Sequence, residues 1–159
     1  MKLIPILIGL WALAAPAQDD AVKKLIRAGD EFYAKRDQEG MALKAIEAYK
    51  KALALEESCT EACWKATLAH YWLGNHEKDS TKQAEIFREA IDFAKMAVAI
   101  DENCIEAHFW LAVMYGLYGQ ACGILQSLHM VDPIKIGISF MNQFSEHRVV
   151  RHFVGFLDE

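Results

Sequence analysis

The chain has 159 residues, enough for one domain of ordinary size, and 53% of them are hydrophobic. A formal net charge of -5 excludes the clustered lysines and arginines that nucleic-acid phosphates require, and it also argues against a polybasic membrane patch. Helix-forming residues dominate and only 3 prolines interrupt the chain, so we expect an all-α protein.

The first 17 residues have the order of a secretory signal. Lys2 precedes an uncharged apolar run at residues 3–13, and Ala15-Pro16-Ala17 matches the small-x-small pattern of a cleavage site. The run is shorter than the roughly 20 residues that a membrane-spanning helix needs. We therefore expect residues 1–17 to be cleaved, the chain to be exported to the periplasm and no membrane contact afterwards. An uncleaved anchor is the alternative.

Helical periodicity follows the signal-like segment. Apolar residues recur at three- and four-residue spacing, which predicts helices near residues 20–35, 40–56, 60–73, 80–100 and 104–118. Polar connections are expected at residues 35–40 and 74–81. Thr60 and Asn103 are the predicted N-caps, with Glu106 completing a capping pair with Asn103. A further helix is expected from about Pro133, and residues 149–157 are expected to be helical too.

An internal repeat links these helices. Residues 52–62 and 97–107 are 45 positions apart and share identical residues at six of their positions, and an aromatic-rich segment follows each of them. One helical hairpin cannot bury its apolar face alone, so successive hairpins must stack. The small-residue and aromatic positions have tetratricopeptide spacing, namely Gly29, Phe32, Ala45, Tyr49, Ala52, Ala90, Ala94 and Ala97. We predict a tetratricopeptide-like solenoid of helical hairpins at residues 18–140, wound as a right-handed superhelix.

Residues 40–136 resemble one subgroup of tetratricopeptide proteins. The resemblance is carried by Glu-Ala-His-Phe-Trp-Leu-Ala-Val-Met-Tyr-Gly-Leu-Tyr-Gly at residues 106–119, Gly-Ile-Leu-Gln-Ser-Leu at 123–128 and Val-Asp-Pro-Ile-Lys at 131–135. This subgroup is the T-component of tripartite ATP-independent periplasmic (TRAP) transporters. The resemblance implies a periplasmic helical-repeat protein that partners a solute-binding protein. Residues 141–159 depart from the family pattern and read as a capping helix or a truncated repeat.

The cysteines suggest two further hypotheses. Cys59 and Cys63 occupy the same repeat positions as Cys104 and His108, which makes a zinc site of three cysteines and one histidine conceivable. A disulfide of Cys59 with either Cys63 or Cys104 is a second alternative. Buried cysteines that act as small apolar residues are the simpler interpretation. We therefore predict no metal and no cofactor.

The histidines show no spacing that suggests nucleophilic catalysis, and no glycine-rich phosphate loop is present, so we expect a binding protein and no enzyme. Exposed aromatic side chains flanked by charge are common anchors for partners. First helices line the concave side of such a solenoid, and the predicted groove residues on them are Lys65, Trp72, Trp110, Leu117 and Tyr118.

Two functions follow from these expectations. The first is an exported scaffold that binds a protein partner or peptide in its concave groove. The alternative is a T-component that holds a small apolar ligand beside a periplasmic solute-binding protein. Self-association into an oligomer is compatible with either function.

Overall fold

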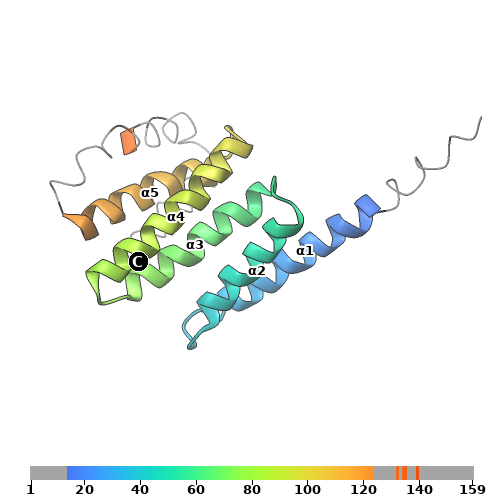
Figure 1. Ribbon diagram of the computed structural model, residues 1–159, viewed down its shortest axis with the longest axis horizontal. Coiled ribbons are helices and arrows are strands. Elements are labelled where there is room, and N and C mark those ends of the chain that lie inside the picture. Colours follow the sequence, from blue (N-terminus) through green and yellow to red (C-terminus); the bar gives the residue numbers. More distant parts are fainter. Residues whose placement is uncertain (1–13, 124–131, 133, 136–138, 140–159) are drawn as a thin grey trace, which may run out of the picture.

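The computed structural model describes residues 14–123, 132, 134–135 and 139, and within them the chain forms helices and no strand. Figure 1 shows the helices side by side in chain order. They are α1 (Ala14–Tyr33), α2 (Met41–Leu55), α3 (Thr60–His76), α4 (Ser80–Ile100) and α5 (Ile105–Cys122). The all-α fold and its five predicted helices are confirmed. In this part of the chain no helix is long and apolar enough to cross a membrane.

Several predicted segments lie outside the described residues. They are the apolar run at residues 3–13, the helix expected from Pro133 and the segment 141–159. Helix α1 begins at Ala14 and continues without a break through the predicted cleavage site. Its Gln18 side chain donates a hydrogen bond to the Leu55 carbonyl oxygen, which ties the start of α1 to the end of α2.

The N-caps of α3 and α5 differ from the prediction by one residue. Cys59 and Cys104 are the caps, and neither side chain makes a capping hydrogen bond. Thr60 is already the first helical residue of α3. Asn103 lies one residue before the observed cap of α5. Its backbone N–H donates to the Asp101 carboxylate over 3.0 Å. The expected pair of Asn103 with Glu106 therefore does not cap α5.

The 45-residue repeat is also visible in the backbone. Glu56 ends α2 at φ -141° and ψ 94°, and its equivalent Asp101 ends α4 at φ -137° and ψ 99°. In both turns the backbone N–H of the N-cap cysteine donates to the carbonyl oxygen of that residue, over 3.2 Å and 3.1 Å. The turns that join successive hairpins thus have the same conformation as well as similar sequences.

Within each hairpin, a glycine on the first helix faces an aromatic ring on the second. A Cβ atom at Gly29 would lie 2.4 Å from the Tyr49 ring, and one at Gly74 would lie 2.3 Å from the Phe87 ring. Both rings are almost fully buried, so neither can move aside. The absence of a side chain at Gly29 and Gly74 therefore sets how closely the two helices of a hairpin approach.

The core consists of two clusters. The first cluster lies mainly between α1, α2 and α3, and it contains the fully buried Ala45, Ala52 and Ala66. The second lies between α4 and α5, around Phe87 and Trp110. Alanines predicted to face the neighbouring helices are indeed fully buried, at Ala45, Ala52, Ala90, Ala94 and Ala97. Small side chains at these positions let the helix backbones approach closely, as the predicted repeat requires.

The glycine contact gives a stability prediction with an internal control. Gly74→Ala places a methyl group into the Phe87 ring, so we expect the free energy of unfolding to fall by about 1–3 kcal/mol. Gly116→Ala meets no atom within 4 Å, and it should raise the free energy of unfolding by up to about 1 kcal/mol through helix propensity. Urea titrations of both variants measure the difference. Equal stability of the two variants would contradict the assigned contact.

Candidate interaction site

Lys65, a predicted groove residue, joins three helices. Its ammonium lies 2.7 Å from Asp30 on α1 and 2.8 Å from Glu61 on α3, and its side chain is only 14% exposed. Tyr49 on α2 donates its hydroxyl proton to the same Asp30 carboxylate over 2.8 Å. Burial alone would lower the pKa of Lys65, but the hydrogen bonds to Asp30 and Glu61 outweigh burial and raise it. Lys65 is therefore a charged residue whose ammonium is bonded to Asp30 and Glu61 within the protein.

Trp110 occupies the repeat position equivalent to Lys65 and is fully buried. Its ring lies 5.1 Å from the Phe109 ring, edge to face, and 5.2 Å from the Tyr71 ring on α3. Both equivalent positions thus face the preceding first helix, Lys65 toward α1 and Trp110 toward α3. The structure places Trp110 in the core, where it cannot contact a partner.

The other three predicted groove residues are half-buried. Leu117 and Tyr118 pack against the second cluster. Trp72 stacks on His76 with 3.9 Å between ring centroids and an interplanar angle of 21°. Trp72 also lines a hollow of about 110 Å³ beside the turn from α1 to α2, together with Leu73, Leu43 and residues 36–40. Partner binding at these three residues stays a prediction.

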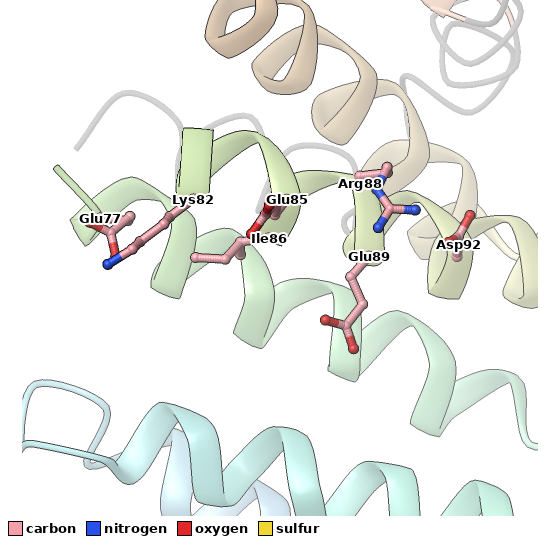
Figure 2. A pocket seen from close by; sticks show the side chains of 7 residues that line it. All are labelled: Glu77, Lys82, Glu85, Ile86, Arg88, Glu89 and Asp92. Carbon is pink, nitrogen blue, oxygen red and sulfur yellow. The ribbon is translucent and has the colours of Figure 1, made fainter. Parts of the chain in front are cut away.

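A larger hollow lies on the exposed side of α4 and has a volume of about 470 Å³. Figure 2 shows the side chains that line it, most of them projecting from α4. Among the described residues the lining consists of Glu77, Lys82, Glu85, Ile86, Arg88, Glu89 and Asp92. Four carboxylates and two basic groups therefore surround one apolar side chain. This hollow was not predicted, because charged residues on the outer face of an amphipathic helix have the pattern of an ordinary solvated surface.

Glu89 connects this hollow to the interior of the protein. One carboxylate oxygen accepts a hydrogen bond from Lys50 on α2 over 2.6 Å, and the other faces the Nε2 atom of His70 on α3 at 3.7 Å. The hydrogen bond from Lys50 is the main cause that lowers the pKa of Glu89. The negative charge on Glu89 is therefore stabilised mainly by the hydrogen bond that joins α2 and α4.

The buried His70 is held in one tautomer. Its Nδ1 atom lies 2.7 Å from the Ala66 carbonyl oxygen, which can only accept, so Nδ1 carries the proton. Nε2 of the neutral ring is then unprotonated and faces Glu89. Burial lowers the pKa of His70 below its ordinary value of about 6.5.

This environment predicts acid sensitivity. Because the folded state lowers the pKa of His70, the unfolded chain binds its proton more readily once the pH falls below about 6.5, and folding stability decreases from there. We expect the free energy of unfolding to fall between pH 7 and pH 5, and to fall less in His70→Gln. Urea titrations across this range test the expectation, with the exposed His76→Gln as the control on the same helix. An unchanged pH dependence in His70→Gln would contradict it.

The cysteines do not form the proposed zinc site or disulfides. All four are free thiols, and no group of three or more metal-binding side chains occurs in the described part of the chain. Burial raises the pKa of Cys63 and of Cys104 to about 11, so both thiols are protonated at neutral pH. Cys59, Cys63 and Cys104 instead belong to the packing of the first cluster. Their repeated positions therefore reflect repeated packing.

A family model and a solved structure are among the known proteins that match this chain. The family model "Regulator of microtubule dynamics protein 1-3" matches residues 25–136. The match to the crystal structure of MamA covers 86% of this chain and 87% of the MamA chain, with 15% sequence identity and a TM-score of 0.30. No curated protein matches the sequence. The matching family model is thus a different one from the T-component family that the sequence resembles.

Proposed function

We propose that this chain, which belongs to the family of regulator of microtubule dynamics proteins 1-3, is a protein-binding scaffold whose partner belongs to the microtubule apparatus. The family supplies the class of partner, and the helical repeat supplies a rigid surface that can hold it. Binding, and not catalysis, is the proposed activity.

The charged hollow on α4 is the observation that carries this proposal. Its lining mixes both signs of charge, and Glu85, Arg88 and Asp92 are exposed. Mixed charges at fixed positions favour one charged partner over others, since a mismatched partner leaves like charges facing each other. The hollow also sits on a helix that is packed on its other side by Phe87 and Ile91, so its side chains project from a rigid support.

Charge reversal in the hollow should weaken partner binding. We expect the full chain to sediment with polymerised tubulin, and Glu85→Lys to reduce the bound fraction several-fold by placing a positive charge among the lining residues. Glu47→Lys makes the same substitution at an exposed position of α2 outside the hollow, and it should bind as the unmodified chain does. Co-sedimentation at several tubulin concentrations gives the measurement.

Two results would count against this proposal. If the chain neither sediments with tubulin nor alters the growth rate of tubulin polymers, the microtubule partner is wrong. If Glu85→Lys and Glu47→Lys weaken binding equally, the hollow is not the contact and overall charge accounts for the effect.

A second candidate function places the chain outside the cytoplasm. The apolar run at residues 3–13 and the Ala15-Pro16-Ala17 pattern support export, and an exported chain would be available to a periplasmic solute-binding protein, as in a TRAP T-component. The hollow beside Trp72 would limit the size of the ligand in that case. Its volume of about 110 Å³ lies well below the roughly 300 Å³ at which small-molecule sites begin, so it could seat only a group the size of one side chain.

Export predicts a shortened chain. We expect protein recovered from the exported fraction to begin near Gln18, because Ala15-Pro16-Ala17 forms the cleavage pattern. N-terminal sequencing of the chain from separated cell fractions measures this. An intact Met1 on all of the protein, recovered from the cytoplasmic fraction, would remove the second candidate and leave the first.

A further inference from the structure

Exposed apolar side chains gather at one edge of the repeat. Among the described residues four large hydrophobic side chains are clearly exposed, and three of them lie at the C-terminal ends of α2 and α4. These three are Leu55 at 43% exposure, Met96 at 42% and Ile100 at 37%. Figure 1 shows both helix ends on the same side of the molecule. We refer to these three residues as the apolar strip.

The strip is a product of the repeat. Leu55 and Ile100 are equivalent, 45 residues apart, and each is the last residue of its helix. Met96 lies one helical turn before Ile100 on the same face. A hydrogen bond from Lys50 to Glu89 over 2.6 Å links α2 to α4. Both second helices therefore present an exposed apolar residue at their C-terminal ends.

The turns that follow the strip carry one sign of charge. Residues 55–64 and 100–109 contain no lysine or arginine, and their six carboxylates are Glu56, Glu57, Glu61, Asp101, Glu102 and Glu106. Glu61 is paired with Lys65. Glu57 and Glu102 are exposed and equivalent in the repeat. The strip is thus bordered by negative charge on its turn side in both repeats, while Lys51, equivalent to Met96, lies one helical turn before Leu55.

We propose that the apolar strip is a docking site for a basic amphipathic segment of a partner protein. Apolar residues at helical spacing on that segment would cover Leu55, Met96 and Ile100, and its lysines or arginines would face Glu57 and Glu102. The strip follows the charged hollow along α4, since the hollow extends from Lys82 to Asp92 and the strip begins at Met96. It therefore adds a second surface to the proposed function.

The charges argue against two other occupants of the strip. A second copy of the chain would bring an equally acidic edge to this one, and the like charges would repel each other. An anionic lipid surface would be repelled by the same carboxylates. A basic protein segment satisfies both the apolar residues and the carboxylates of the turns.

A synthetic peptide tests this site directly. The probe is a fluorescein-labelled 18-residue peptide of leucine and lysine, with leucines at i, i+3, i+4 and i+7, and fluorescence anisotropy with the full chain measures its affinity. We expect binding that weakens as salt rises, and an affinity at least about tenfold lower for Leu55→Ser/Ile100→Ser and for Glu57→Lys/Glu102→Lys. A peptide with serine in place of leucine should not bind.

Matched variants separate the strip from general effects. Leu43→Ser removes the fourth exposed apolar side chain, and Glu31→Lys/Glu47→Lys makes the same charge change on α1 and α2 away from the strip. Both should bind the peptide within about twofold of the unmodified chain, as should Glu85→Lys in the hollow. Circular dichroism confirms that each variant is folded. Because Glu85→Lys changes the hollow and not the strip, a failure of peptide binding can be told apart from a failure of the microtubule proposal.

Three outcomes would overturn the docking site. One is equal weakening of peptide binding in the strip variants and the control variants, which would indicate unspecific attraction to an acidic protein. Another is a dimer of the full chain that Leu55→Ser/Ile100→Ser dissociates, as measured by sedimentation velocity. The last is binding to phosphatidylcholine–phosphatidylserine vesicles that the same variant abolishes.

Discussion

The contact between a glycine and an aromatic ring inside each hairpin is the constraint on which the rest of the structure depends. Gly29 lies against Tyr49, and Gly74 lies against Phe87, at distances that leave no room for a side chain. This contact brings the paired helices close enough for the alanines of α2 and α4 to be fully buried. The Tyr49 ring that packs on Gly29 also places its hydroxyl 2.8 Å from Asp30, to which it donates a hydrogen bond.

The ring that packs against the glycine comes from a different repeat position in each hairpin. Gly29 and Gly74 are 45 residues apart, but Tyr49 and Phe87 are only 38 apart, so the second ring comes from two helical turns earlier in its helix. Correspondingly, α4 has 21 residues and α2 has 15. The first turns of α4 are equivalent in the repeat to the connection between α1 and α2 in the first hairpin. Lys82 and Glu85 lie on these turns, which is why the large hollow belongs to the second hairpin.

The repeat, the helices and their alanine faces could be predicted from the sequence, because periodicity and a 45-residue identity depend on local spacing alone. The burial of Trp110 could not, since α5 has apolar residues on all sides and no polar face that would orient it. The hollow depends on contacts between distant residues, such as Lys50 with Glu89, 39 positions apart. A one-residue error at Thr60 and Asn103 arose because the caps there are cysteines without side-chain hydrogen bonds.

The length of α4 has a consequence for how partners could be arranged around this protein. Lys82 in the hollow and Ile100 in the apolar strip are 18 residues apart on one unbroken helix, which corresponds to about 27 Å. An unbroken helix fixes the distance between groups that are bound along it. Two segments bound at its ends would be held at a set distance and a set rotation about the helix axis. If both segments belonged to one partner, the second would bind at the high effective concentration that the first creates.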